Sequence, residues 1–434
     1  MSQVNKISFS MSILSWMIAF LALSSAVFAE PLQLDIAGEA AILMNADSGV
    51  ILFEKEAYIP RYPASTTKIA TALYVLKFKK EDLDKVLTAE QDAVATITQE
   101  AKRKANYQLP AYWLEPDGSH IGLKKGEQMT MRDLLAGILI SSGNDASNVV
   151  AQAVGGSIPR FMDQLNAYLK EIGCRQTTFY NPHGLHHPQH QTTAYDLAIM
   201  MREALKEPLF CQLIAQQRFV RPKTNKQAAT TLLQTNRLIR PGKFYYSKAI
   251  GGKTGYHSKA KKNFVVAARS DDRTLIAVLM GYEDRNTIFQ EAIKLFDAAF
   301  NQPKVQRIFL RAGQQSFKQD IARADRPLQT YLSENLSLDY YPAENPQAKC
   351  FLYWQPVELP IHKDQQVAEL HLVDAQGKLL RKVPLLAVED VHLKWPYSWL
   401  AKIEYVFNTF PILAVLGLGL LIVSFFSLWI IKQK

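Results

Sequence analysis

Ser65 and Lys68, a serine followed three residues later by a lysine, are the first pair in this chain that could perform covalent chemistry. A serine hydroxyl becomes a good nucleophile when a base takes its proton, and a lysine amine can be that base only if its pKa is lowered. Burial of the amine or a neighbouring cation would lower it. Residues three apart share one face of a helix, so the spacing predicts a nucleophile beside its base.

Two further motifs follow in order, Ser142-Gly143-Asn144 and Lys253-Thr254-Gly255. Each motif alone arises by chance in chains of this length, but their order and wide separation favour a single site. We expect Lys253 to be the cation that lowers the pKa of Lys68. Ser142 is expected to relay a proton to the leaving amine, and Asn144 to bind a substrate amide and hold Lys68 in place.

The third motif also predicts the kind of substrate. Lys253 and Thr254, at the start of an edge strand, would meet a substrate carboxylate, and Gly255 would let the ligand backbone come close. This arrangement favours substrates with a free C-terminus. The backbone amides of Ser65 and Tyr256 are expected to bind the oxyanion that forms during acyl transfer.

The elements that must position these motifs follow from hydrophobic periodicity. Pro63 precedes Ser65 and an apolar run follows it, which places Ser65 in the first turn of a helix. Paired apolar runs joined by turn residues predict two hairpins, 40–45 with 50–54 and 263–268 with 274–280. Apolar residues at three- and four-residue intervals predict helices over 131–140, 157–172 and 193–205. Strands at both ends with helices between them predict an α+β domain with an antiparallel sheet over residues 30–303.

The pattern of apolar and polar residues changes after Pro303, which predicts a second domain. Short alternating runs broken by Gly, Asp, Asn and Pro are typical of a small all-β domain over 304–391. Residues 392–409 interleave aromatic and charged residues, as an interfacial amphipathic segment does. Residues 99–116, polar and then aromatic, are predicted to be either a surface excursion near the mouth of the site or simply a long loop.

The two ends of the chain predict its compartment. Residues 1–29 have the basic start, apolar centre and small-residue end of a secretory signal peptide. Residues 410–431 carry no charge and are long enough to span a bilayer as a helix. Lys432 and Lys434 follow directly, so the positive-inside rule places the C-terminus in the cytoplasm. We therefore expect a single-pass protein of the cytoplasmic (inner) membrane with its catalytic domain on the periplasmic, extracytoplasmic side.

Composition restricts the partners further. The formal net charge of +10 is compatible with an anionic membrane or cell-wall polymer, but scattered basic residues in an exported chain argue against nucleic acid. Three cysteines, Cys174, Cys211 and Cys350, exclude a disulfide framework and allow at most one bridge. Their spacing predicts no metal site, and we expect neither metal nor cofactor, even though histidines gather at 183–190.

With these motifs in place, the chain resembles the low-molecular-mass penicillin-binding proteins that are D-alanyl-D-alanine carboxypeptidases. The resemblance rests on Pro63-Ala64-Ser65-Thr66-Thr67-Lys68, Ser142-Gly143-Asn144-Asp145-Ala146, His183-Gly184-Leu185, Thr193-Ala194-Tyr195-Asp196-Leu197 and Gly252-Lys253-Thr254-Gly255. It extends to 360–365 and 384–389, which resemble the family's C-terminal β-domain. The resemblance thus covers about Leu34 to Val391.

The resemblance implies a β-lactamase/transpeptidase-like domain followed by a β-sandwich stalk. It implies removal of the terminal D-alanine from peptidoglycan stem pentapeptides through an acyl-enzyme on Ser65, with β-lactam antibiotics as covalent inhibitors. Arg237, in the Asn-Arg pair upstream of the third motif, is implied to assist carboxylate binding. Tyr256 departs from the pattern, since many members have His there, and the full span after the aromatic segment departs from the usual amphipathic end.

Three alternatives stand beside this reading. A class A β-lactamase would need an E-x-x-L-N motif between Asn144 and Lys253, and the sequence has none there. A D,D-endopeptidase that cuts cross-links uses nearly the same chemistry and stays open. An inactive, membrane-anchored wall-binding protein is disfavoured because every motif residue is present.

Overall fold

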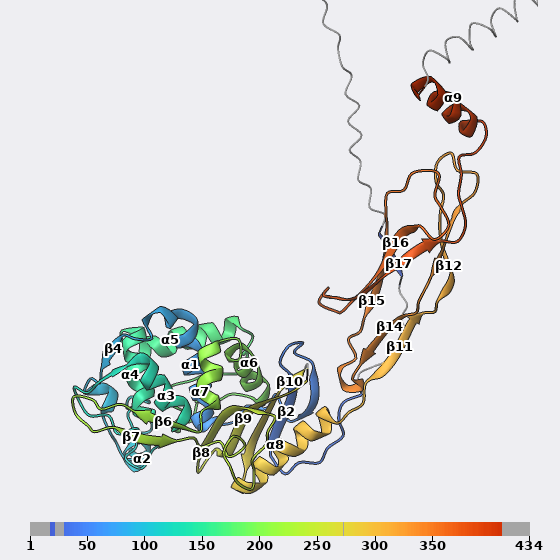
Figure 1. Ribbon diagram of the computed structural model, residues 1–434. Helices are drawn as coiled ribbons and strands as arrows, with labels where there is room; N and C mark the ends of the chain where they lie inside the picture. Colours follow the sequence, from blue (N-terminus) through green and yellow to red (C-terminus); the bar gives the residue numbers. More distant parts are fainter. Residues whose placement is uncertain (1–17, 22–29, 272, 410–434) are drawn as a thin grey trace, which may run out of the picture. The chain divides into compact units, whose positions relative to one another are not determined.

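The computed structural model describes residues 18–21, 30–271 and 273–409 (Figure 1). The chain divides into two units: an N-terminal unit, Ala29–Pro303 with Pro342–Glu344, and a C-terminal unit that contains Lys304–Tyr341 and the residues from Asn345 onward. The predicted membrane span, 410–431, lies outside the described residues, and so does the predicted signal peptide, 1–29, except for four residues.

An antiparallel five-stranded sheet lies at the centre of the N-terminal unit, in the order β3-β2-β10-β9-β8. Its strands are β2 (Ala40–Asn45), β3 (Ile51–Lys55), β8 (Ala249–His257), β9 (Lys261–Ser270) and β10 (Arg273–Tyr282). β2 pairs with β3, and β9 pairs with β10, so both predicted hairpins are confirmed. β8, which carries the third motif, is an edge strand, but Lys253 lies in its middle rather than at its start.

The strands alternate between two apolar cores because successive side chains point to opposite faces. Ile42 and Val278 face a core shared with helices, whereas Leu43 and Leu279 face a second core. The first face packs against the helices α1 (Lys68–Lys79), α3 (Met131–Ile140), α4 (Asn144–Gly155), α5 (Ile158–Glu171), α6 (Ala194–Ala204) and α7 (Pro208–Ala215). The second face packs against α8 (Arg285–Phe300), as Figure 1 shows. The sheet is therefore covered by helices on both faces.

Short elements complete this unit. They are the 3₁₀ turns Ala64–Thr67, Lys80–Asp82 and Asp92–Val94, the helix α2 (Gln99–Lys104), and the strands β4 (Val86–Thr88), β5 (Gln128–Thr130), β6 (Arg218–Arg221) and β7 (Thr230–Leu233). The predicted surface loop at 99–116 therefore begins with a helix. Thr98 caps α2, since its hydroxyl accepts a hydrogen bond from the Ala101 amide at 3.2 Å.

The C-terminal unit is built from β-strands and ends in one helix. Its strands are β11 (Val305–Leu310), β12 (Gly313–Gln319), β13 (Leu328–Leu332), β14 (Leu336–Tyr340), β15 (Lys349–Trp354), β16 (Gln366–Val373) and β17 (Leu379–Ala387). A 3₁₀ turn at Pro342–Glu344 interrupts them and belongs to the N-terminal unit. Six strands form one sheet in the order β1-β15-β16-β17-β13-β12, and β11 pairs with β14. The edge strand β1 (Ile18–Leu21) pairs with β15. This is the all-β architecture expected after Pro303.

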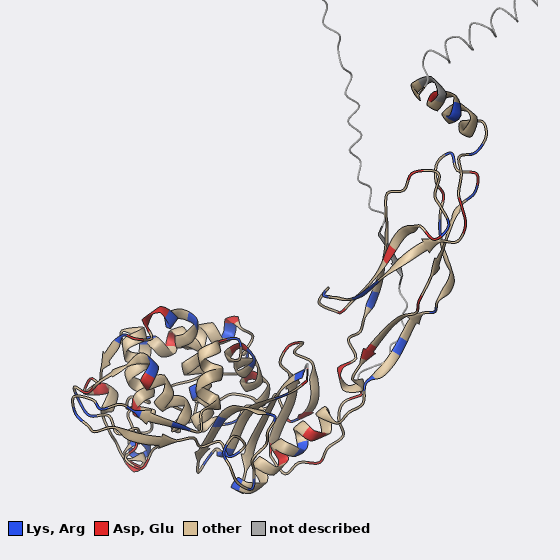
Figure 2. Ribbon diagram, in the orientation of Figure 1, with Lys and Arg blue, Asp and Glu red and all other residues tan. Residues whose placement is uncertain are grey.

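The helix α9 (Tyr397–Thr409) ends the described part of the chain. Aromatic side chains in and just before it are exposed, with Trp395 at 76% and Trp399 at 62% of their possible surface. Within the described ranges, the chain forms no helix with the length and hydropathy needed to cross a membrane. Basic and acidic residues are interspersed along both units, so the excess positive charge is not gathered on one element (Figure 2).

Candidate active site

The nucleophile lies in a tight 3₁₀ turn, Ala64–Thr67, that runs directly into α1, so Ser65 stands in the first turn of a helix as expected, with 3₁₀ geometry. Side chains within the turn fix its shape: the Thr66 hydroxyl donates to the Pro63 carbonyl, and the Thr67 hydroxyl donates to the Ala64 carbonyl, each at 2.8 Å. Ala64 adopts a φ of +50°, a left-handed conformation that costs free energy for a residue with a Cβ. The turn therefore stores backbone strain beside Ser65.

Lys68 is completely buried, and its amine has three neighbours. Nζ lies 2.9 Å from Ser65 Oγ, 2.7 Å from Asn144 Oδ1 and 2.7 Å from the carbonyl oxygen of His183. A neutral amine has two N–H groups and one lone pair. If the two N–H groups donate to Asn144 and His183, the lone pair is left to face the hydroxyl of Ser65. The two acceptors thus orient Lys68 as a base.

Electrostatics favour that neutral form. Burial lowers the pKa of Lys68 well below its ordinary value, and the nearby charge of Lys253 lowers it further. Burial alone lowers the pKa of Lys253 to about 7. Both causes named from the sequence, burial and a neighbouring cation, therefore act on Lys68, and burial is the larger.

Ser142 joins the second motif to the third. Its hydroxyl accepts a hydrogen bond from Lys253 Nζ at 2.9 Å. The residue has a φ of +69° between α3 and α4, so the backbone is strained where the hydroxyl is presented. Asp145 links the connection between α3 and α4 to a neighbouring segment. Its carboxylate accepts hydrogen bonds from three successive backbone amides, those of residues 121–123.

Gly255 allows β8 to lie against the nucleophile turn. A Cβ at this position would lie 2.8 Å from the Pro63 carbonyl oxygen and 3.0 Å from the Ser65 nitrogen. From the sequence we expected a ligand backbone in this space, but in the structure the nucleophile turn itself occupies it. Asn263 on β9 fastens the same contact, since its amide donates to the carbonyl oxygens of Tyr62 and Pro63 at 2.8 and 3.0 Å.

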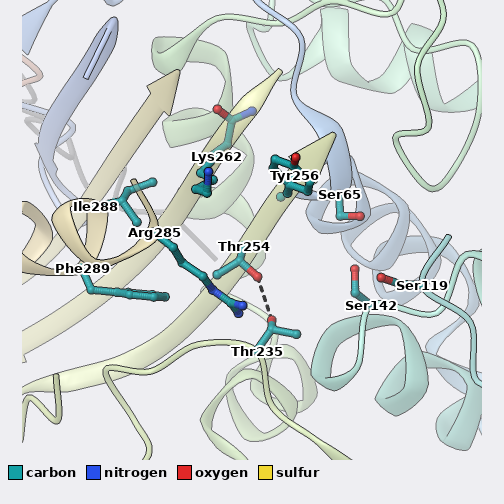
Figure 3. Close-up of a pocket in the computed structure, with 12 residues that line it drawn as sticks. Ser65, Ser119, Ser142, Thr235, Thr254, Tyr256, Lys262, Arg285, Ile288 and Phe289 are labelled. Atoms are coloured by element: carbon teal, nitrogen blue, oxygen red, sulfur yellow. Dashed lines mark hydrogen bonds between the residues drawn. The ribbon is translucent and has the colours of Figure 1, made fainter. Parts of the chain in front are cut away.

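A cleft of about 370 Å³ opens above these groups. It is lined by Ser65, Ser119, Ser142, Thr235, Thr254, Gly255, Tyr256, Lys262, Asn263, Arg285, Ile288 and Phe289. Figure 3 shows the three serines on one side, Thr254 in the middle bonded to Thr235, and Arg285 with Phe289 on the other side. The cleft therefore runs from the reacting hydroxyls to a cation.

Arg285, not Arg237, lines this cleft among the residues that the structure describes. Arg237 donates to Asn286 Oδ1 at 3.1 Å, and its guanidinium lies 5.9 Å from the ring centres of Phe244 and Phe289. Burial and the charges of Arg237 and Arg240 lower the pKa of Arg285. Arg237 thus contacts Asn286 and Phe289 of α8, next to Arg285, and is not itself among the residues that line the cleft.

Comparison with known proteins decides between the possible serine acyl-transferases. The family model described as D-alanyl-D-alanine carboxypeptidase matches residues 26–284, which include all three motifs. The chain belongs to this family. The expectation of a serine-type D-alanyl-D-alanine carboxypeptidase is confirmed.

Relatives of the family share most of the chain's length. The D-alanyl-D-alanine carboxypeptidase DacF of Bacillus subtilis is 31% identical over 81% of this chain and 85% of its own. Penicillin-binding protein 6B of Escherichia coli superposes with a TM-score of 0.56 at 25% identity, over 82% of this chain and 96% of that one. The carboxypeptidase DacD of Francisella tularensis shares the fold, with a TM-score of 0.57 at 22% identity, over 86% and 98% of the two chains.

Tyr256, the departure from the carboxypeptidase pattern, lies at the rim of the cleft. It is 65% exposed, and its ring lies 5.2 Å from the amine of Lys262. The substitution therefore changes the outer wall, as expected, while the backbone that would bind an oxyanion stays part of β8.

The histidines that follow the His183-Gly184-Leu185 motif pack with aromatic rings. Tyr62 and Tyr107 meet the His186 ring edge-on, and Tyr180 stacks on His187 at 4.3 Å between ring centres. Burial lowers the pKa of His186 to about 4, which keeps it neutral at pH 7. Among the described residues, no cluster of His, Cys, Asp or Glu has the arrangement of a metal site. The three cysteines carry free thiols.

Seven residues of the cleft were not found from the sequence, namely Ser119, Thr235, Lys262, Asn263, Arg285, Ile288 and Phe289. A signal for Arg285 was present: it is the first residue of α8, directly after the cap Asp284. A cation at that position opposes the helix dipole. Such a local conflict is a hint of function.

Proposed function

We propose that Ser65 attacks the carbonyl between the last two D-alanines of a peptidoglycan stem pentapeptide and forms an acyl-enzyme. The observation that carries this proposal is the 2.9 Å approach of the buried Lys68 amine to the Ser65 hydroxyl. Geometry and lowered pKa together make this lysine a base that can act at neutral pH.

The first step forms the acyl-enzyme. Ser65 Oγ bonds to the carbonyl carbon while its proton passes to the lone pair of Lys68. The amides of Ser65 and Tyr256 bind the oxyanion, whose charge is stabilised most in a site that excludes water. When the intermediate collapses, the C–N bond breaks and the terminal D-alanine leaves.

The leaving amine needs a proton, and Ser142 is placed to supply one. Its hydroxyl is bonded to Lys253, so a proton passed through Ser142 can be replaced from the amine of Lys253. The carboxylate of the leaving D-alanine binds at Thr254 and Arg285, which both line the cleft (Figure 3). Asn144 binds the peptide amide on the acyl side.

A water molecule completes the cycle. Its oxygen bonds to the acyl carbon, the ester bond to Ser65 breaks, and the proton of the water returns to Ser65 Oγ. Lys68 then releases to solvent the proton that it took during acylation, and Lys253 takes one from solvent, which restores both amines. The missing E-x-x-L-N motif removes the deacylating base of class A β-lactamases. A bound penicillin is therefore expected to hydrolyse slowly and to leave a lasting adduct on Ser65.

We also propose that this chemistry takes place outside the cytoplasmic membrane, with the chain anchored near its C-terminus. The support comes from the sequence of the two ends, 1–29 and 410–431, and from the exposed aromatic residues of α9. Protease treatment of intact spheroplasts tests this: the catalytic unit should be degraded. Protection until the cells are lysed would contradict the proposal.

The purified ectodomain and a stem pentapeptide test the reaction itself. Mass analysis should show loss of one alanine, and labelled penicillin should attach to the wild type but not to Ser65→Ala. Release of cross-linked dimers without loss of a terminal alanine would point to an endopeptidase instead. No labelling of the wild type would overturn the acyl-enzyme.

A further inference from the structure

A buried ion pair lies outside the catalytic motifs, between Lys102 of α2 and Glu115. Lys102 Nζ donates to Glu115 Oε1 at 3.2 Å and to the Trp113 carbonyl oxygen at 2.6 Å. The two side chains are only 4% and 10% exposed. Removing two charges from water is costly, and burial lowers the pKa of Lys102. A pair kept at that cost calls for a specific role.

Residues 99–119, which we call the clasp, contain this pair and reach Asn144. The backbone carbonyl of Ser119 accepts a hydrogen bond from the backbone N–H of Asn144 at 2.8 Å. A Cβ at Gly118 would lie 2.9 Å from Asn144 Nδ2, so the clasp backbone is pressed against that side chain. Asn144 Oδ1 is one of the two acceptors that orient Lys68.

The clasp also reaches the second acceptor, His183. The ring Nε2 lies 3.0 Å from the Tyr112 carbonyl oxygen, and ring Nδ1 accepts a hydrogen bond from the Leu185 amide at 3.1 Å. With Nδ1 accepting, Nε2 carries the proton and donates to Tyr112. Asn148 of α4 donates to the same carbonyl at 2.8 Å. The clasp therefore holds the ring whose backbone carbonyl receives Lys68.

We propose that Lys102 and Glu115 are positioning residues that fasten the clasp over Asn144 and His183, and thereby keep the amine of Lys68 dry and aligned with Ser65. This proposal rests on the role given to Lys68 above. Neither residue touches the cleft.

The same helix supplies a matched control. Lys104 and Glu100 form an ion pair at 2.8 Å, but their side chains are 77% and 63% exposed. Exposed pairs of this kind contribute little. Glu100→Gln therefore removes an ion pair from α2 but leaves the buried pair and the contacts of the clasp with Asn144 and His183 in place.

The experiment compares wild type, Glu115→Gln and Glu100→Gln in the rate of acylation by labelled penicillin between pH 5 and pH 9. Glu115→Gln should acylate between about tenfold and a hundredfold more slowly, because small misplacements of a base cost that much. In a plot of its acylation rate against pH, the acid limb, where the rate falls as pH falls, should move to higher pH. The reason is that water reaching Lys68 raises the pKa of that amine. Glu100→Gln should match the wild type in both respects.

The direction in which the acid limb moves distinguishes two roles for Glu115, positioning of the clasp and a direct effect of its charge on Lys68. Loss of the Glu115 carboxylate would by itself disfavour the charged form of Lys68 and move the acid limb to lower pH. Lys253 and Asp145, the charged groups that act on Lys68, stay in place in every variant. An acid limb that stays or moves down, or an equal loss in Glu100→Gln, would overturn the proposal. If Glu115→Gln does not fold, Lys102→Arg, which keeps the cation but moves its donors, must show the same upward movement.

Failure here can be told from failure of the proposed function. If Ser65 is not the acylated residue, the wild type itself is not labelled. If only the clasp proposal fails, the wild type is labelled and Glu115→Gln acylates like it.

Discussion

Lys253 Nζ lies 2.9 Å from Ser142 Oγ, which repeats at the second serine the arrangement that Lys68 makes at the first. Both amines are completely buried, and both have lowered pKa values. Burial therefore favours in each amine the neutral form, which can take a proton from its serine. The site holds two such pairs, one for each proton transfer of the acylation step.

Lys68→Met should reduce acylation by penicillin about a thousandfold, because the side chain keeps its apolar stem but loses the base. The rate of labelling measures this. Lys77→Met, a change at an exposed lysine of the same helix, is the control and should acylate normally. Wild-type rates in Lys68→Met would refute its assignment as the base.

Lys253 should make stability depend on pH in the alkaline range. Its pKa is about 7 in the folded protein and 10.5 ordinarily, so between these values the unfolded chain binds more protons. Stability is then highest above pH 10.5 and is lost as pH falls toward 7, by on the order of 5 kcal/mol from this residue. Lys68 acts with the same sign.

Urea unfolding at pH 7, 8 and 9 tests this contribution. The free energy of unfolding should rise with pH in the wild type and rise less steeply in Lys253→Met, where the contribution of Lys253 is lost and those of the other buried lysines remain. Equal slopes in the two proteins would mean that Lys253 is charged when folded.

Ser142 allows strain and function to be separated. Ser142→Ala and Ser142→Gly both remove the hydroxyl, so both should lose acylation to a similar degree. Glycine accepts a φ of +69° without cost, so the Gly variant should be about 1 kcal/mol more stable than the Ala variant. Acylation rates and urea unfolding give the two answers; equal stabilities would show that the turn relaxes.

Arg285→Gln should weaken recognition of the terminal carboxylate. A charge-assisted hydrogen bond is worth about 1.5–3 kcal/mol, so kcat/KM for a free-acid peptide should fall about tenfold to a hundredfold. The matching peptide amide should be affected little. Arg237→Gln, a change at a residue that does not line the cleft, should cause a smaller loss. A larger loss there would restore the assignment made from the family resemblance.

The part of the site that depends on local spacing could be predicted from the sequence. Ser65 and Lys68 are one helical turn apart, and the hairpins and the helix at 131–140 follow from periodicity alone. The convergence of Ser65, Ser142 and Lys253 required no geometry either, because three ordered motifs already indicate one site.

The rest depends on long-range packing. Arg285 reaches the cleft only because α8 starts beside β9 and β10, and Thr235 only because its loop approaches β8. Lys102 and Glu115 are polar residues in a polar segment, and nothing in their spacing shows that both become buried. Gly255 was recognised as necessary, but only the fold shows that its neighbour is the nucleophile turn.

The order of the central sheet has a consequence for the biosynthesis of the enzyme. β2 and β3 are made first, yet β2 needs β10 as its other partner, and Lys253 is supplied only with β8. In a growing or translocating chain, Lys68 has water around it, keeps its ordinary pKa and stays protonated. Closing such distant pairings is slow. Ser65 is thus synthesised early but stays unreactive until the last strands of its unit have paired. Labelling by penicillin therefore shows that the unit has finished folding, as well as that it is active.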